Sequence, residues 1–235
     1  MLIGDPSIDA VLFDAGGVLI LPDPDGFRRA LAPFGAVPDD ETCRRAHYEG
    51  MRECDVLGGP KWPLVDRVVA RVAGVREDLI DEALDAVHGV FRSPWVTAAG
   101  SSDCLTTLMS AGKRTGVVSN ASGEIEAMLR DLEICCIAHD ADEVAGPGIP
   151  RVECIVDSTV VGIEKPDPQI FHIALERIGL EADRCAYIGD TVTFDVNGAR
   201  AAGLRPFHLD PYGLCPDTDH EHVQDLSQVL VLPDN

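Results

Sequence analysis

Residues 8–17 read IDAVLFDAGG, and this stretch decides the fold. The run from Ile8 to Phe13 is apolar apart from one aspartate, which is the pattern of a short buried strand. Asp14 follows the run directly, and the glycine pair Gly16 and Gly17 then predicts a turn. The first predicted strand therefore ends on a carboxylate.

Strand and helix patterns alternate in the second half of the chain. Strands are predicted at 114–118, 153–156, 186–188 and 205–209, and helices at about 102–111, 123–132, 168–178 and 193–202. This alternation predicts an α/β fold, a three-layer Rossmann-like core in which helices cover both faces of a parallel sheet. Ligands bind to such sheets outside the carboxyl ends of the strands.

A helical segment interrupts this pattern between the first strand and the rest. Apolar residues recur there at helical spacing, and Pro24 and Pro94 bound the segment. We therefore expect a core domain made of residues 1–21 and 94–235, with a helical domain inserted at 22–93.

Composition and charge exclude several functions. Lys and Arg number 19 against 40 Asp and Glu, a net charge of −21, which argues against a nucleic-acid-binding surface. No signal peptide or apolar membrane span is recognisable, so we expect a cytoplasmic protein without a membrane partner. The eight cysteines form no C-x-x-C pair, which favours reduced, mostly buried thiols.

Two further segments carry weaker expectations. The chain has no Lys or Arg after Arg205, and we interpret this acidic tail as a solvated surface. The connection 138–151 contains several Gly and Pro residues and is longer than usual, which favours a hairpin or a flap.

The residues that follow the predicted strands form a chemical pattern. They are Asp14, Ser119, Lys165, Asp190 and, one turn later, Asp195. Carboxylates that converge on one crevice repel one another unless a cation lies between them, and such oxygen ligands suit Mg²⁺. An aspartate beside the ion can attack phosphorus, Ser119 can donate a hydrogen bond to the phosphoryl group, and Lys165 can neutralise its charge. The N–H groups around Gly16 and Gly17 could hold the same group.

Four segments resemble the motifs of the haloacid dehalogenase-like (HAD) hydrolase superfamily. They are FDAGGVL at 13–19, VSN at 118–120, KPDPQIF at 165–171 and IGDTVTFD at 188–195. The helical insert lies where subfamily I of that superfamily carries its C1 cap.

The resemblance implies a role for each matching residue. Asp14 would be the nucleophile, and Ser119 and Lys165 would act in catalysis as phosphate binders. Gly16, Gly17 and Asn120 would complete the substrate-binding set. Mg²⁺ would be held by Asp14, the carbonyl of Gly16, Asp190 and Asp195, with Asp195 acting directly or through water. The expected substrate is a small phosphorylated metabolite.

One position departs from the pattern of the phosphatase members. They carry a second aspartate, the general acid and base, two residues after the nucleophile, where this chain has Gly16. Loss of such a group typically lowers the rate ~10²–10⁴-fold. We expect a Mg²⁺-dependent phosphatase that acts through an aspartyl-phosphate on Asp14.

Three alternatives stay open beside the phosphatase. The first is a 2-haloacid dehalogenase, because halide leaves without a proton. The second is a protein that binds a phosphorylated metabolite or a partner without turnover. The third is a phosphonate-cleaving enzyme, which would need Lys61 as a Schiff-base lysine, although Lys61 is better interpreted as an exposed turn residue.

The helical insert offers possible substrate contacts. Arg44, Arg45, His47, Tyr48 and Arg52 cluster on one predicted helix. Histidine is suited to acid and base work, and arginines suit a carboxylate or a second phosphate. The opposing interpretation is a solvated helix face, and no motif indicates an oligomeric state.

Overall fold

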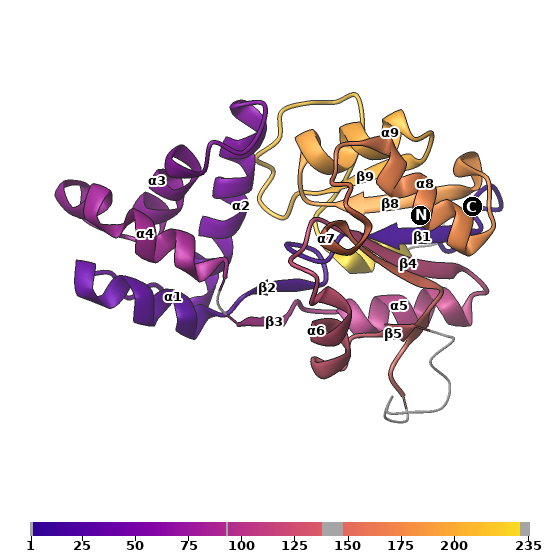
Figure 1. Cartoon of the computed structure of the whole chain (residues 1–235), viewed down its shortest axis with the longest axis horizontal. Coiled ribbons are helices and arrows are strands. Elements are labelled where there is room, and N and C mark those ends of the chain that lie inside the picture. The colour runs from indigo at the N-terminus through magenta and orange to yellow at the C-terminus, as the bar shows by residue number, and fades with distance from the viewer. Residues whose placement is uncertain (1, 93, 138–147, 231–235) are drawn as a thin grey trace. The chain divides into compact units, whose positions relative to one another are not determined.

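A computed structural model describes residues 2–92, 94–137 and 148–230 of the chain (Figure 1). The chain divides into two compact units. The first contains residues 1–19, 97–211 and 217–235, and the second contains residues 20–96 and 212–216.

The first unit is built on a parallel sheet. Within the described residues its strands are β1 (Ala10–Phe13), β4 (Arg114–Ser119), β7 (Cys154–Asp157), β8 (Cys185–Gly189), β9 (Arg205–Leu209) and β10 (Glu221–Val223). They lie in the order β10-β9-β8-β1-β4-β7. The predicted α/β fold with a parallel sheet is confirmed.

Helices cover both faces of this sheet. In Figure 1, α5 (Ser101–Ser110) and α6 (Ile125–Asp131) lie on one side, and α8 (Pro168–Ile178) and α9 (Asn197–Ala201) lie on the other. Smaller elements are α7 (Ser158–Val161), the 3₁₀ turns Ala182–Arg184 and Leu226–Leu230, and the pair β5 (Cys136–Ile137) and β6 (Arg151–Val152). Because both faces are covered, the central strand β1 is buried along its whole length, which explains its apolar sequence.

The order of the strands reverses between β1 and β8. From β1 the chain adds β4 and β7 on one side, and it then returns to build β8, β9 and β10 on the other. Asp14 N donates to Ile188 O across this junction at 2.8 Å. Asp14 and Asp190 therefore leave the sheet from neighbouring strands at the point where such folds bind ligands.

Two local expectations for the first unit need correction. The helix predicted at 193–202 begins as a π-helical turn at Val192–Val196, and α9 follows it. The acidic tail is not simply a solvated surface, because β10 pairs with β9 and Asp210 is buried. Of the predicted hairpin or flap at 138–151, residues 138–147 lie outside the described residues.

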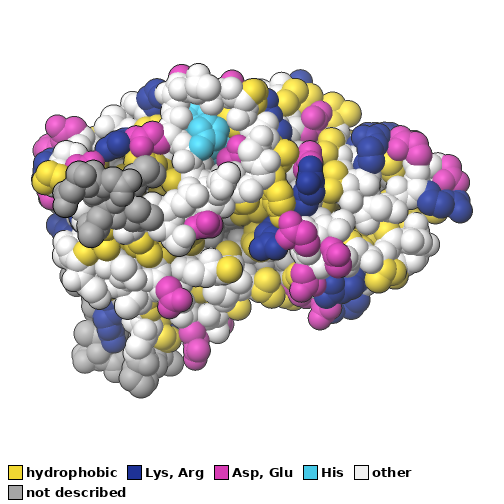
Figure 2. Space-filling view, turned by 180° about the vertical axis from the view of Figure 1, so that it is seen from behind, with side chains coloured by type: hydrophobic (Ala, Val, Ile, Leu, Met, Phe, Trp, Pro, Cys, Tyr) yellow, Lys and Arg dark blue, Asp and Glu magenta, His cyan; other side chains and the backbone are white. Residues whose placement is uncertain are grey.

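The cysteines lie in the environment that the sequence analysis predicts. The eight cysteines are free in this structure, and all but Cys215 are buried, as the expectation of mostly buried thiols requires. Among the described helices, none has both the length and the apolar character to cross a membrane. On the face shown in Figure 2, acidic and basic side chains lie intermingled.

The second unit is mainly helical. Its helices are α1 (Pro24–Leu31), α2 (Asp40–Val56), α3 (Trp62–Val72) and α4 (Ile80–Val90), with 3₁₀ turns at Ala32–Phe34 and Glu77–Leu79. Strands β2 (Ile20–Pro22) and β3 (Trp95–Thr97) pair where the chain enters and leaves it. Asp23 caps α1 by accepting from Asp25 N and Gly26 N, and Asp39 caps α2 by accepting from Thr42 N, so both starts are encoded locally.

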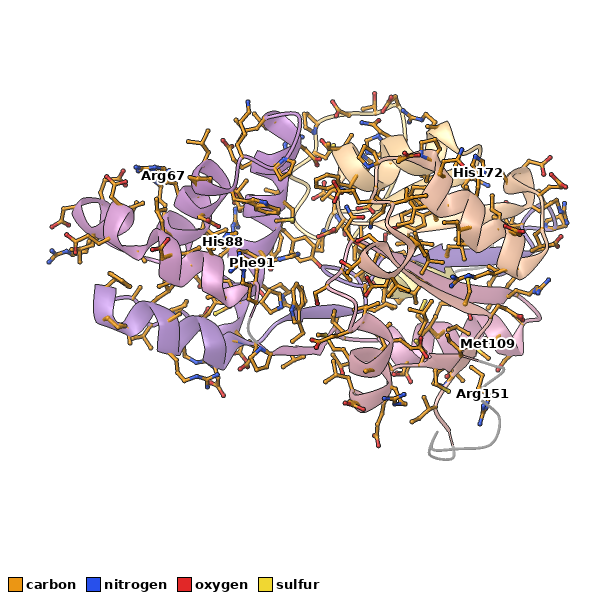
Figure 3. All side chains as sticks on the ribbon, in the orientation of Figure 1. Arg67, His88, Phe91, Met109, Arg151 and His172 are labelled. Atoms are coloured by element: carbon orange, nitrogen blue, oxygen red, sulfur yellow. The ribbon has the colours of Figure 1, made fainter. Side chains whose placement is uncertain are left out.

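The five polar residues singled out on α2 do not share one environment. Arg44 pairs with Glu41, and Arg45 pairs with Glu49 at 3.1 Å, so both guanidinium groups bind carboxylates of their own helix. His47 and Tyr48 are buried, and the His47 ring lies 6.1 Å from that of Phe91 just after α4, a residue labelled in Figure 3. His47 is thus a core residue of this unit.

Candidate active site

The ammonium group of Lys165 lies at the centre of the site. The residue is only 2% exposed. Its Nζ lies 3.0 Å from Asp14 Oδ1, 2.6 Å from Asp195 Oδ1 and 3.0 Å from the hydroxyl of Tyr187. An ammonium has three N–H donors, and each of them has an acceptor here. Lys165 thereby connects the end of β1, strand β8 and the π-helical turn.

Asp195 is held by donors on both of its oxygens. Oδ1 accepts from Lys165 and lies 3.0 Å from the Tyr187 hydroxyl, while Oδ2 accepts from Thr191 N at 3.0 Å and Thr191 Oγ1 at 2.6 Å. Burial raises the pKa of this carboxyl, but the attraction of Lys165 and these hydrogen bonds outweigh it and hold the pKa below its usual range. Asp195 is therefore a fixed carboxylate.

The residue that faces Asp195 on β8 must be small. A Cβ atom at Gly189 would collide with the Asp195 carboxyl group. Because hydrogen bonds hold that group on both oxygens, it cannot easily move aside. Gly189 is therefore required where the strand ends.

Among the described residues, the donors that contact Asp14 share one oxygen of its carboxylate. Oδ1 accepts from Ala15 N at 2.7 Å and from Lys165 Nζ, and neither of these donors uses Oδ2. Burial raises the pKa of Asp14 to about 7, because the attraction of Lys165 is offset by repulsion from the Asp195 and Asp190 carboxylates. A cation at the site would favour the ionised form of Asp14.

Carboxylate oxygens of Asp14, Asp190 and Asp195 all lie within 4.8 Å of one another, and all three residues are buried. In the part of the chain that the structure describes, one ammonium, that of Lys165, contacts these carboxylates. Burial lowers the pKa of Lys165, but the attraction of Asp14 and Asp195 outweighs it and raises the pKa, so the lysine stays charged. The excess of negative charge and the hard oxygen donors fit a divalent cation such as Mg²⁺.

The remaining predicted residues lie beside this cluster. Ser119 is buried at the end of β4, the strand next to β1. Asn120 donates from Nδ2 to the carbonyl of Lys165 at 3.0 Å and accepts from the Lys165 N–H at 2.7 Å. Both ends of the Asn120 amide thus hold the backbone of the lysine. Gly16 and Gly17 lie in the turn after Asp14, where Gly17 has a φ of 78° that favours glycine.

Sequence reasoning missed two residues of the site. Tyr187 lies fully buried inside β8, with its hydroxyl 3.0 Å from Val118 O as well as from Asp195. Thr191 follows Asp190 and holds Asp195. A signal existed for Tyr187, because a tyrosine inside a short apolar strand needs a polar partner for its hydroxyl.

Lys61 has the environment of an ordinary surface residue. It is exposed in the second unit at the start of α3, which agrees with its interpretation as an exposed turn residue.

The chain is similar in sequence to several known proteins. The sequence model of haloacid dehalogenase-like hydrolases matches residues 8–203. "Phosphatase MT3486" of Mycobacterium tuberculosis (strain CDC 1551 / Oshkosh) is 27% identical over 231 residues, which are 95% of this chain and 97% of that protein. "Haloacid dehalogenase-like hydrolase domain-containing protein 3" of Danio rerio is 28% identical over 134 residues, 56% of this chain but only half of that protein.

Among solved structures, a dehalogenase has a similar fold. The two structures align with a TM-score of 0.61 at 20% sequence identity, and the alignment covers 98% of this chain and all of the dehalogenase chain. At this identity the likeness concerns the fold alone.

Proposed function

Because the chain belongs to the haloacid dehalogenase-like hydrolase family, we propose that it is a Mg²⁺-dependent phosphatase of a small phosphorylated compound. One observation carries the proposal, namely the buried Lys165 that binds Asp14 and Asp195 beside the carboxylate of Asp190. The similarity to a phosphatase over almost the whole chain supports it. Asp14 is the proposed nucleophile.

The geometry of Asp14 suits attack on phosphorus. Ala15 N and Lys165 Nζ both contact Oδ1, and Oδ2 is the proposed nucleophilic atom. Oδ2 forms a bond to phosphorus while the bond to the leaving oxygen breaks, which gives an aspartyl-phosphate. Water then attacks the phosphorus, phosphate leaves and the carboxylate of Asp14 is restored.

The residues around Asp14 stabilise the charge of the phosphoryl group or position Lys165. Asp14, Asp190 and the carbonyl of Gly16 would hold Mg²⁺, which would supply positive charge for the phosphoryl oxygens. Lys165 adds a second cation, and Ser119 and the N–H groups near Gly16 and Gly17 donate hydrogen bonds. Asn120 and Asp195 are positioning residues for Lys165, because their polar atoms bind it directly. Asp195 has donors on both oxygens, so it supports the metal through water.

The helical second unit is proposed as the C1 cap of subfamily I, with the functional domain at residues 22–93. Gly16 leaves the reaction without the usual acid for the leaving oxygen. Turnover is then fastest for substrates whose leaving group needs no proton.

Phosphate release from p-nitrophenyl phosphate tests the proposal. We expect hydrolysis that depends on added Mg²⁺ and disappears in Asp14→Asn. Asp131→Asn removes an exposed carboxylate at the end of α6 and serves as the matched control, with activity unchanged. A phosphoryl adduct on the peptide that contains Asp14 would identify the intermediate. Tight phosphoester binding without hydrolysis would instead favour a binding protein.

Gly16 also favours a second candidate, a 2-haloacid dehalogenase, because halide leaves without protonation. Asp14 would then attack carbon rather than phosphorus. Halide release from 2-haloacids in EDTA, lost in Asp14→Asn, would identify this reaction. The absence of halide release, together with Mg²⁺-dependent phosphate release, would exclude it.

A further inference from the structure

A second group of metal-binding side chains lies in the first unit, apart from the carboxylates. His208 is on β9, His222 is on β10 and His220 immediately precedes β10. His208 and His222 are register partners in this parallel pair, so their side chains project from the same face of the sheet. The ring centroids are 4.5 to 5.3 Å apart. We call these three residues the histidine cluster.

Each ring is oriented by an oxygen on its outer side. His208 Nε2 lies 3.2 Å from Asp190 O, His220 Nδ1 lies 2.8 Å from Asp219 Oδ1, and His222 Nε2 lies 3.0 Å from Asp217 O. Carbonyl and carboxylate oxygens only accept, so these ring nitrogens carry the hydrogen. In a neutral imidazole the second nitrogen then presents a lone pair.

The inner nitrogens come together at metal-site spacing. His208 Nδ1 and His220 Nε2 are 3.3 Å apart, and one ligand atom from each of the three rings lies within 4.8 Å of the others. Two ring nitrogens face each other at this distance when they share a proton, and a metal ion bound between the rings would take the place of that proton. Zinc–nitrogen bonds of 2.0–2.1 Å in a tetrahedral site place two ligands about 3.4 Å apart, close to the observed spacing.

Carboxylates add to the attraction for a cation. Asp210 is buried, and its Oδ2 lies 3.5 Å from His222 Nδ1. Asp219 orients His220 from outside, as carboxylates commonly do behind histidines that bind zinc. The cluster thus has imidazole nitrogens at metal-site spacing, outer acceptors that orient the rings and carboxylates nearby.

We propose that His208, His220 and His222 bind a divalent transition-metal ion, for which Zn²⁺ is the best match. Imidazole nitrogens favour zinc, whereas Mg²⁺ requires oxygen ligands, so the histidine cluster and the carboxylates of Asp14 and Asp190 select different ions. The bond from His208 to the carbonyl of Asp190 joins the two sites through the backbone. The proposal stands independently of the phosphatase reaction.

Zinc binding to the full chain without an affinity tag tests the proposal. The protein is stripped with a chelator and titrated with Zn²⁺ in excess Mg²⁺, which occupies the carboxylates. We expect one tightly bound zinc per chain by calorimetry and elemental analysis. Affinity falls at least tenfold in His208→Gln and in His220→Gln. Substituting Co²⁺ should give the intense visible absorption of a tetrahedral nitrogen site.

His172→Gln is the matched control, because His172 is exposed on α8 (Figure 3) and should leave zinc binding unchanged. Circular dichroism checks that each variant is folded, and His222→Gln provides a third substitution if one of the others unfolds. The proposal is overturned if the wild-type chain binds no zinc. It is also overturned if Mg²⁺ displaces the zinc, or if folded cluster variants bind it as tightly as His172→Gln does.

Discussion

Replacing Lys165 with methionine removes the ammonium that contacts Asp14 and Asp195 in the candidate active site while keeping a side chain of similar length. Asp14 and Asp195 then lose their cation, and the hydroxyl of Tyr187 loses a donor. The electrostatic account of the site predicts a large loss of stability in the metal-free protein.

The size of this loss follows from burial and distance. Lys165 is 2% exposed, and its two carboxylate partners lie at 3.0 and 2.6 Å. Removing one partner of a buried ion pair costs about 3–5 kcal/mol, because it leaves an uncompensated charge. We expect about 4 kcal/mol for Lys165→Met, which is about a thousandfold in the unfolding equilibrium.

The loss should depend on pH. Without Lys165 the pKa of Asp14 rises further, since the attraction that lowered it is gone. Asp14 then takes up a proton near neutral pH and relieves part of the repulsion. The loss is therefore larger at pH 8.5 than at pH 6.

Urea unfolding in EDTA, followed by circular dichroism, measures the effect. The matched control is Arg76→Met, which breaks an ion pair to Asp78 in which both side chains are about two thirds exposed. Such a pair contributes about 0.2–1 kcal/mol. The reasoning is refuted if Lys165→Met costs no more than Arg76→Met, or if its cost is the same at both pH values.

Three further predictions concern the same site. Gly16→Asp should restore a proton donor and raise the turnover of substrates with poor leaving groups by up to ~10²-fold. The hydrolysis rate should then depend less steeply on the pKa of the leaving group. An unchanged slope of rate against leaving-group pKa would contradict the prediction. The folded-state pKa of Asp14, about 7, lies above its unfolded value, so folding takes up a proton and stability rises as pH falls. From pH 8 to pH 6, the free energy of unfolding of the metal-free wild-type protein should rise by about 1.4 kcal/mol relative to that of Asp14→Asn, measured by urea unfolding. The same pH dependence of stability in both proteins would contradict this. Gly189→Ala should cost about 1–3 kcal/mol, because its Cβ meets the fixed Asp195 carboxyl. Gly89→Ala is the control, because open space surrounds the new Cβ in α4, and it should cause no loss of stability. Equal losses of stability in Gly189→Ala and Gly89→Ala would refute the proposed collision with Asp195.

The site could be located from sequence because strand ends are local features. A short apolar run followed by a polar residue identified Asp14 and Asp190, and parallel strands bring their carboxyl ends to one edge. The same reasoning indicated Ser119, Lys165 and Asp195, although their roles in catalysis stay predictions.

What sequence reasoning could not supply are contacts between residues far apart in the chain. Asn120 resembles a substrate ligand in its motif, yet its amide binds the backbone of a residue 45 positions later. Tyr187 and Asp195 meet because the π-helical turn directs Asp195 back over the end of β8, and no residue pattern marks that turn. The acidic tail was misjudged because pairing of β10 with β9 depends on the whole sheet.

By itself, the sequence determined the parallel α/β architecture, and it predicted the helical insertion and the polar residues of the candidate site. These depend on periodicity and on neighbours along the chain. Tertiary structure alone decided that one buried ammonium holds two carboxylates, and that ring nitrogens of His208, His220 and His222 lie within 4.8 Å of one another. The physical reason is that Coulomb attraction and metal ligation depend on distances of a few ångströms between atoms, which only the folded chain sets.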